Sequence, residues 1–304
     1  MTTSAIAVSG LRKAYRGEVV LGGIDLDVPA GTVFALLGPT GSGRTTTVDV
    51  LTTVVRPDGG TARVAGHDLA TEAGAVRAAI GVTGRFAAVD ERRTGRENLQ
   101  LTADLKGVVV PDLLERLDLA EVAKKPVSTY SGGMRRKLDL AMALVGKPRV
   151  LFMDEPTAGL DPRGRRTTWA LIRELVADGL TVFLTTQHFD EAERLADRIA
   201  VLDHGRLVAE GTPGELKRGL PGPHIRLRFA TAAQFGAGAR ILPESTKDRE
   251  ALALRVPSDG GTQAVRNVLD RLDEYAVSAE ELSVHAPDLE DVFLALTAEL
   301  RKPA

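Results

Sequence analysis

Short and largely apolar runs recur along the first two thirds of the chain. Three of them are Val33–Leu37, Val150–Asp154 and Thr181–Thr186. Runs of this length without strict polar alternation are typical of strands buried on both faces of a sheet. Between the last two runs, Arg165–Asp178 carries apolar residues at helical spacing. This strand–helix–strand order predicts a parallel sheet with crossover helices.

The segments around these runs show other patterns. Ala5–Ser9 and Val19–Val28 alternate apolar with polar positions, which predicts an antiparallel β part. Ile199–Ala209 predicts a strand–turn–strand hairpin. Residues 86–145 are mostly helical in pattern, so we interpret them as a helical insertion into the sheet-forming domain.

The last part of the chain predicts a separate unit. A stretch rich in glycine and proline suggests a linker at 219–224, between a domain at 1–218 and a small domain at 225–304. Within the small domain we expect two strands and two amphipathic helices, at Ile225–Phe229, Ala251–Val256, Gln263–Tyr275 and Leu289–Leu300. The expected fold class is therefore α/β, with a parallel core sheet, an antiparallel β part and a helical insertion, followed by a small α+β domain.

Composition narrows the possible functions. Among 304 residues, 39 are basic and 41 acidic, and this near-neutral balance argues against a nucleic-acid partner. The absence of cysteine excludes disulfides, thiolate metal sites and cysteine nucleophiles. No apolar run approaches the roughly 18–20 residues of a membrane helix, and the amino terminus lacks the features of a signal peptide. Of the basic residues, 30 are arginine and 9 are lysine.

Gly38–Thr46 lies between a predicted strand and a predicted helix and has the spacing of a Walker A phosphate loop. Its glycines let the backbone N–H groups form an anion-binding nest, and the helix adds the positive end of its dipole. Thr45 stands where a hydroxyl ligand of Mg²⁺ is expected. Arg44 replaces the usual lysine, with a planar fork in place of a slim point charge. The candidate phosphate-binding residues are Gly38, Thr40, Gly41, Ser42, Gly43, Arg44, Thr45 and Thr46. A glycine-rich turn without a ligand is the alternative, and the other motifs decide between the two.

Two further motifs carry phosphate chemistry. Asp154 and Glu155 end a predicted buried strand, where Asp154 would hold Mg²⁺ through water and Glu155 would polarise an attacking water. Ser131, Gly132 and Gly133 open a basic amphipathic helix about twenty residues earlier, which suggests a second anion-binding helix terminus. An ordinary serine N-cap is the alternative there. The position between the phosphate loop and the Asp-Glu strand disfavours it.

Together these motifs resemble the nucleotide-binding subunit of ABC transporters, over essentially residues 1–218. The resemblance implies that Ser131–Met134 is the signature loop. It also implies that Ala158–Asp161 is the D-loop, with Asp161 among the catalytic residues. Tyr15, about thirty residues before the phosphate loop, matches the aromatic residue that stacks on adenine.

Two positions depart from the family pattern. The segment that ends at Arg85 aligns with the Q-loop, whose glutamine helps to ligate Mg²⁺. Counting back from Glu191 places Gln187, rather than His188, where the family has the histidine that contacts the γ-phosphate. Glutamine donates a hydrogen bond to a phosphate but cannot become a cation.

Several features narrow the resemblance to the ATP-binding subunits of daunorubicin/doxorubicin-resistance exporters. These are Gln187, the Tyr130–Arg136 signature, the Val82–Gly84 segment and, in the small domain, Leu289–Thr297. Such a subunit binds ATP and Mg²⁺ between two copies, in a homodimer or with a related ATP-binding subunit. It drives a separate multi-span membrane permease from the cytoplasmic face of the cell membrane, and the surface around Arg85 and the helical insertion would contact that permease.

Three functions remain open. In the first, the chain hydrolyses ATP, with Glu155, Gln187 and Asp161 as catalytic residues, and powers efflux of a drug or antibiotic. In the second, Arg44, Arg85 and Gln187 impair hydrolysis, and the chain acts as a nucleotide-dependent clamp or regulatory subunit. A non-transport ABC ATPase of translation or DNA repair is the third, but the single cassette and the lack of a basic surplus disfavour it.

Overall fold

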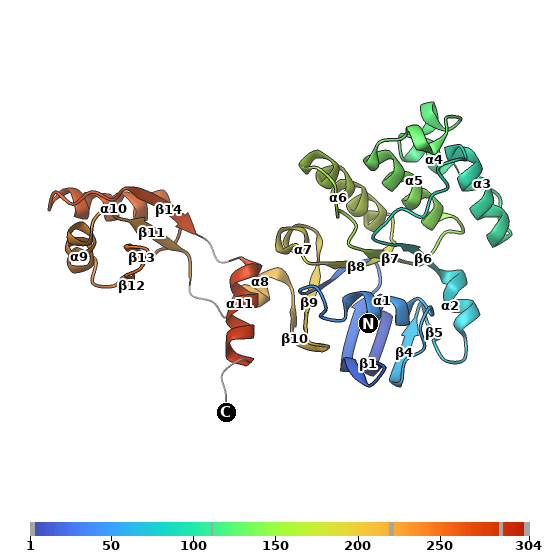
Figure 1. The fold of residues 1–304 in the computed structure, drawn as a ribbon, viewed down its shortest axis with the longest axis horizontal. Helices are drawn as coiled ribbons and strands as arrows, with labels where there is room; N and C mark the ends of the chain where they lie inside the picture. The colour runs from blue at the N-terminus through green and yellow to red at the C-terminus, as the bar shows by residue number, and fades with distance from the viewer. Residues whose placement is uncertain (1–3, 111, 219–221, 286–287, 301–304) are drawn as a thin grey trace. The chain divides into compact units, whose positions relative to one another are not determined.

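The computed structural model describes residues 4–110, 112–218, 222–285 and 288–300. The chain divides into two compact units, Met1–Leu216 and Lys217–Ala304. Residues 219–221 of the predicted linker lie outside the described residues, so the domain boundaries at 218 and 225 stay a prediction. Each unit is described by itself (Figure 1).

A six-stranded sheet forms the centre of the first unit, in the order β10-β9-β3-β8-β7-β6. Five neighbouring strands are parallel, and β10 adds to β9 in the antiparallel sense. The bounds are β3 (Val33–Leu37), β6 (Ile80–Thr83), β7 (Val150–Asp154), β8 (Thr181–Thr186), β9 (Arg198–Asp203) and β10 (Arg206–Gly211). Every residue of β3 and β8 is buried, as their apolar runs predict. The parallel core sheet confirms the expected fold class.

A second, antiparallel sheet has the order β2-β1-β4-β5. Its strands are β1 (Ser4–Tyr15), β2 (Glu18–Pro29), β4 (Gly59–Val64) and β5 (His67–Asp68). Apolar residues of this sheet, including Ile6 and Leu26, share one core with Phe34, Phe152 and Phe183 of the central sheet. The sequence pattern ended the first strand at Ser9, whereas β1 continues to Tyr15. The alternation breaks because the register shifts between Val8 and Leu11, where Gly10 has a φ of 58°.

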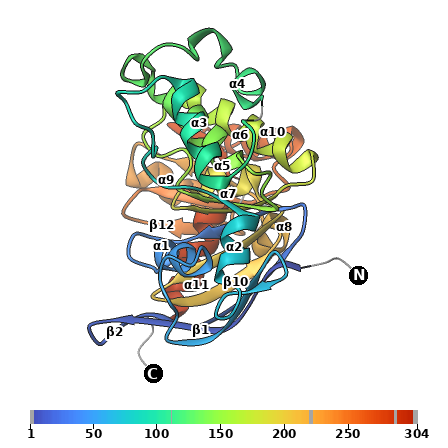
Figure 2. The same ribbon diagram turned by 90° about the vertical axis from the view of Figure 1, so that its right-hand side faces the viewer.

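Helices surround the central sheet. Figures 1 and 2 show α3 to α6 on one side of it, and α1 with the antiparallel sheet on the other. The bounds are α1 (Arg44–Leu51), α2 (Ala73–Ala79), α3 (Gly95–Lys106), α4 (Leu113–Arg116), α5 (Gly132–Leu144), α6 (Pro162–Ala177), α7 (Phe189–Leu195) and α8 (Pro213–Lys217). With two short 3₁₀ turns, Ala120–Val122 and Val127–Thr129, α3 to α5 form the predicted helical insertion. A capping box between Thr94 and Glu97 fixes the start of α3.

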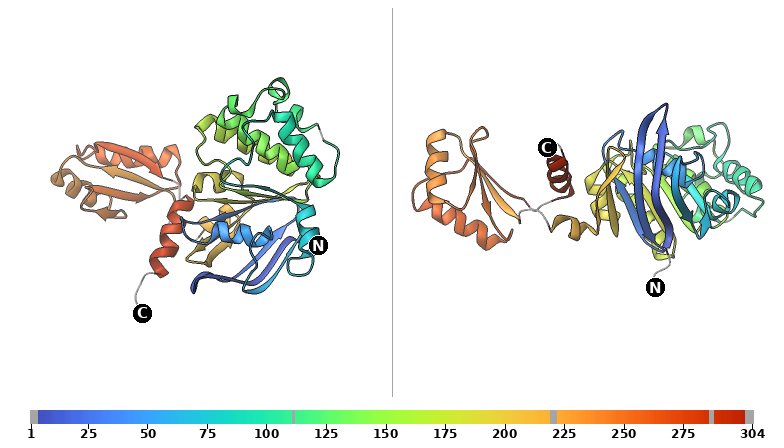
Figure 3. Two further views of the ribbon diagram at one scale, coloured as in Figure 1. Left: turned by 45° about the vertical axis from the view of Figure 1, so that its right-hand side comes forward. Right: turned by 90° about the horizontal axis from the view of Figure 1, so that it is seen from below.

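The second unit holds a four-stranded antiparallel sheet in the order β12-β13-β11-β14 (Figure 3). The bounds are β11 (His224–Arg228), β12 (Thr246–Asp248), β13 (Ala253–Pro257), β14 (Glu281–His285), α9 (Ala232–Ile241), α10 (Thr262–Asp273) and α11 (Leu289–Leu300). Residues of α9 and α10, among them Phe235 and Leu272, form one core with the sheet. This is the expected α+β unit.

The sequence pattern places Val265, Val268, Leu269 and Leu272 on one apolar stripe of α10. Val268 and Leu272 are buried and Val265 packs against the same core, but Leu269 is 39% exposed, so this part of the predicted stripe is wrong. The side chain of Leu300, at the end of the helix expected at Leu289–Leu300, lies outside the described residues. Among the helices that the structure describes, none has the length and apolar character needed to cross a membrane.

Candidate nucleotide-binding site

The phosphate loop connects the carboxyl end of β3 to α1, as the motif predicts. Gly41 and Gly43 have φ values of 83° and 106°, which favour glycine. A Cβ on Gly43 would lie 2.9 Å from the Val20 carbonyl oxygen, and one on Gly38 would lie 2.2 Å from that of Leu202. The glycines are therefore needed both for the backbone conformation and for the close packing of the loop on β2 and β9.

Arg44, the first residue of α1, is only 6% exposed. Its Nη2 lies 3.2 Å from Glu155 Oε1, so the guanidinium pairs with the carboxylate that follows β7. Burial lowers the pKa of Arg44, and the charge and hydrogen bond of Glu155 oppose that shift. Nη1 is also buried, and no acceptor among the described residues bonds to it.

Thr45 and Asp154 come together at the same edge of the sheet. Thr45 Oγ1 donates to Asp154 Oδ2 at 3.2 Å, and Thr185 Oγ1 donates to the other carboxylate oxygen. A hydroxyl and a carboxylate are the hard oxygen ligands that Mg²⁺ prefers, and such sites take their remaining ligands from phosphates and water. This donor pair fits Mg²⁺. No group of three or more histidine or acidic side chains suitable for a metal occurs within the described part of the chain.

Glu155 has a left-handed backbone, with a φ of 47°. Its N–H donates to the Thr185 carbonyl at 3.1 Å, which fixes this conformation at the end of β7. Non-glycine residues with positive φ are uncommon and concentrate at functional sites. Glu155 Oε2 lies 3.3 Å from Arg85 Nε, so each carboxylate oxygen faces a different arginine. Arg85 itself is 56% exposed in its side chain.

The other predicted site residues near the loop are Gln187 and Tyr15. Gln187 follows β8, and its Oε1 accepts a hydrogen bond from Thr40 Oγ1 at 3.3 Å. It is thus Gln187 that reaches the phosphate loop, while the backbone N–H of His188 bonds to Thr186 at the start of α7. Tyr15 ends β1 and is 42% exposed, and Lys13 Nζ lies 5.3 Å from its ring centroid.

Ser131, Gly132 and Gly133 lie in a different place. Ser131 caps α5 by accepting from the Met134 N–H at 3.2 Å, and Asp161 caps α6 by accepting from the Gly164 N–H at 2.6 Å. The three signature residues and Asp161 line one cavity of about 520 Å³. Within the described residues, the lining of this cavity includes none from the phosphate loop. The structure therefore places the predicted residues in two separate groups.

Arg136 is a buried residue at the site that the sequence analysis missed. From α5, its Nε donates to the Pro156 carbonyl at 3.1 Å and its Nη1 to the Gly84 carbonyl at 2.5 Å. Asp139 Oδ2 lies 3.5 Å from Nη1, and burial lowers the pKa of Arg136. This arginine ties the signature helix to the residues next to Glu155 and Arg85. The available signal was its helical spacing of four from the buried Leu140.

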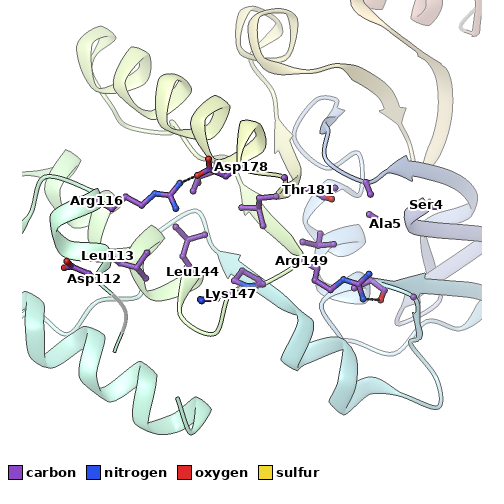
Figure 4. Close-up of a pocket in the computed structure, with 18 residues that line it drawn as sticks. Ser4, Ala5, Asp112, Leu113, Arg116, Leu144, Lys147, Arg149, Asp178 and Thr181 are labelled. Atoms are coloured by element: carbon purple, nitrogen blue, oxygen red, sulfur yellow. Dashed lines mark hydrogen bonds and ion pairs between the residues drawn. The ribbon is translucent and has the colours of Figure 1, made fainter. Parts of the chain in front are cut away.

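A cavity of about 780 Å³ lies at the opposite edge of the central sheet, where β7 begins at Val150 and β8 begins at Thr181 (Figure 4). Its lining is mostly apolar, and an ion pair between Arg116 and Asp178 lies in its wall. None of the predicted site residues lines it. The candidate nucleotide site instead lies where these strands end, in an open loop region.

A parallel sheet with a phosphate loop after β3 and two carboxylates after β7 defines a P-loop nucleotide-binding protein. A family model described as ABC transporter matches residues 21–158. A daunorubicin resistance ATP-binding protein of Streptomyces coeruleorubidus is 46% identical, over 99% of this chain and 98% of the relative. The daunorubicin/doxorubicin resistance ATP-binding protein of Streptomyces peucetius is 45% identical, over 97% and 93%. A solved ATP-binding subunit of an ABC transporter, 27% identical, superposes with a TM-score of 0.64 over 71% of this chain and 93% of that one.

The chain belongs to the ABC transporter family, as an ATP-binding subunit of the daunorubicin/doxorubicin-resistance type. This confirms the resemblance drawn from the motifs, which extends through the second unit to nearly the whole chain.

Proposed function

We propose that this chain hydrolyses ATP in the presence of Mg²⁺ and thereby powers the export of a drug or antibiotic through a separate membrane permease. One observation carries the proposal. The phosphate loop, the Thr45–Asp154 oxygen pair and Glu155 meet at one edge of the sheet, whereas the signature residues and Asp161 line another cavity. Each chain then supplies two unlike halves of a nucleotide site.

Each residue has a chemical role in this proposal. The backbone N–H groups of Gly38–Thr46 bind the phosphates, and Tyr15 stacks on the adenine. Thr45 and Asp154 would hold Mg²⁺, which would supply positive charge to neutralise the phosphates. Glu155 polarises the attacking water as a general base, and Gln187 donates a hydrogen bond to the γ-phosphate.

Because the halves are separate, we propose that ATP is bound between two chains, in a homodimer or with a related ATP-binding subunit. Ser131, Gly132, Gly133 and Asp161 of one chain would face the phosphate loop of the other. Hydrolysis would add charge repulsion and open the dimer. The permease would contact the surface around Arg85 and the helical insertion, and the chain would lie at the cytoplasmic face of the membrane.

A second candidate is a nucleotide-dependent clamp with little hydrolysis. It is favoured by the two arginines that face Glu155, because a general base must have an oxygen free to accept a proton from water. The two candidates share the nucleotide-driven dimer and differ in turnover.

ATPase rates of the native chain and of Glu155→Gln separate them. We expect Glu155→Gln to lower the rate at least about a hundredfold and to accumulate an ATP-bound dimer on size-exclusion chromatography with light scattering. Glu121→Gln, on an exposed turn of the helical part, is the charge-matched control and should keep the native rate. Equal rates for the native chain and Glu155→Gln would rule out hydrolysis and leave the clamp. Co-purification with a multi-span membrane protein tests the exporter assignment.

A further inference from the structure

Two guanidinium groups hold one carboxylate at the candidate nucleotide site. Arg44 Nη2 lies 3.2 Å from one oxygen of Glu155 and Arg85 Nε lies 3.3 Å from the other. With Asp154 beside them, the two positive and two negative side chains sum to zero. The acidic side chains of the site therefore neutralise its two arginines.

The two ion pairs of Glu155 are longer than strong salt bridges. Charge-assisted N–H···O bonds typically span about 2.7–2.9 Å, and both contacts here are longer. Arg44 Nη1 and Glu155 Oε2 are buried without a hydrogen bond to any described residue. A buried guanidinium N–H that lacks an acceptor is costly. Arg44 therefore has a donor available for an acceptor that the protein does not supply.

A triphosphate supplies such acceptors next to the same loop. Guanidinium groups form bidentate hydrogen bonds with phosphate oxygens. The side chain of Arg85 is half-exposed, so it can turn from Glu155 toward a ligand. ATP without a metal ion carries about four negative charges, and two guanidinium groups offset more of them than a single lysine would.

We propose that Arg44 and Arg85 exchange Glu155 for the phosphates of bound ATP, and that this pair of guanidinium groups lets the site bind ATP without a divalent cation. The exchange also releases Glu155, so that ATP binding itself frees the general base. This inference rests on the proposed function only in that the loop binds nucleotide.

The test is equilibrium binding of a fluorescent ATP analogue, measured in excess EDTA and in excess Mg²⁺. We expect the native affinities under the two conditions to agree within about fivefold. Arg85→Gln should weaken binding in EDTA by roughly tenfold, the effect of losing one charge-assisted contact, and weaken it by less than about threefold with Mg²⁺. Arg85→Lys should restore part of the loss. Arg56→Gln removes an exposed charge outside the site and should change neither affinity.

Glu155→Gln provides a second test of the proposed exchange. Because Glu155 competes with the phosphates for both arginines, its neutralisation should tighten binding in EDTA by about threefold or more. The inference is overturned if EDTA abolishes native binding, if Arg85→Gln weakens binding equally under both conditions, or if Glu155→Gln leaves the EDTA affinity unchanged. No binding under either condition would instead overturn the proposed function. Circular dichroism of each variant confirms that it is folded.

Discussion

Arg44 and Glu155 form an ion pair with 3.2 Å between Nη2 and Oε1, although 111 residues separate them in sequence. The sheet order explains the contact, because β3 and β7 lie on either side of β8 and end at the same edge. Two strand spacings of about 4.8 Å each separate those ends. The long arginine side chain crosses this distance from the start of α1.

Arg44→Lys tests whether arginine binds ATP better at this position than the lysine that is usual in a phosphate loop. Lysine keeps the charge but loses the planar fork, so it cannot bind two phosphate oxygens in the bidentate geometry of a guanidinium. We expect the affinity for ATP, measured by isothermal titration calorimetry, to fall by about three- to tenfold. Arg56→Lys, at an exposed position, is the control. Unchanged or tighter binding would mean that arginine merely replaced lysine here in an arginine-rich chain.

Gly43→Ala tests the packing of the phosphate loop. The φ of Gly43 is 106°, and a Cβ would lie within 2.9 Å of atoms of Val20 and Leu21. We expect a loss of about 2–4 kcal/mol in the free energy of unfolding, from backbone strain plus the clash, measured with urea. Gly107→Ala also has a positive φ but meets nothing within 4 Å. Its cost should be only about 1 kcal/mol, so equal losses in both variants would contradict the packing argument.

The central strands were predictable because burial on both faces leaves no ambiguity in an apolar run such as Val33–Leu37. The extension of β1 to Tyr15 was not, because the bulge at Gly10 breaks the alternation on which a strand prediction depends. In the second unit, α9 contains two glycines and mostly small residues, and β14 has only Leu282 and Val284 as apolar positions. The helix therefore gives no clear periodic signal, and the alternation in the strand is too short to identify it.

At the candidate site too, some contacts could be predicted from the sequence and others could not. The motifs assigned Thr45 and Asp154 to one Mg²⁺ site, and Thr40 and Gln187 to phosphate binding, and the structure brings the members of each pair within hydrogen-bond distance. The pairing of Glu155 with two arginines depends on side-chain geometry that no spacing rule contains. Spacing rules therefore predict which residues share a site, but not how their charges pair.

Arg136→Met tests the buried arginine of α5. Its Nε and Nη1 donate to the carbonyls of Pro156 and Gly84, and methionine fills a similar volume without donors. Because a buried carbonyl, a half-buried carbonyl and Asp139 lose their partner, we expect a loss of about 3 kcal/mol in the free energy of unfolding. Lys137→Met, which removes an exposed ion pair with Asp118, should cost less than about 1 kcal/mol. Urea denaturation measures the free energy of unfolding of both variants. Similar losses would show that the hydrogen bonds of Arg136 to Pro156 and Gly84 do not stabilise the fold more than an exposed ion pair does.

The last prediction concerns pH and the second unit. His224 on β11 stacks on His285 of β14, with ring centroids 5.4 Å apart. Burial is the main cause that lowers the pKa of His224, and the charges of His285 and Arg255 add to it, while Asp291 opposes them. The folded state therefore binds this proton less readily than the unfolded chain does. Stability from this group is present above the unfolded pKa of about 6.5 and is lost as the pH falls through and below that value.

We expect the urea midpoint of the second unit to fall between pH 7.5 and pH 5.5, roughly the window around the ordinary histidine pKa. His224→Phe keeps an aromatic ring beside His285 but cannot take up a proton, so the fall should be smaller in this variant. His204→Phe changes a histidine that is 87% exposed in its side chain, and it should leave the native pH dependence intact. Carboxylates contribute equally to all three proteins. The difference in how far the urea midpoint falls with pH therefore reports the contribution of His224. An equal fall of the urea midpoint with pH in the native chain and in His224→Phe would show that this histidine does not couple folding to pH.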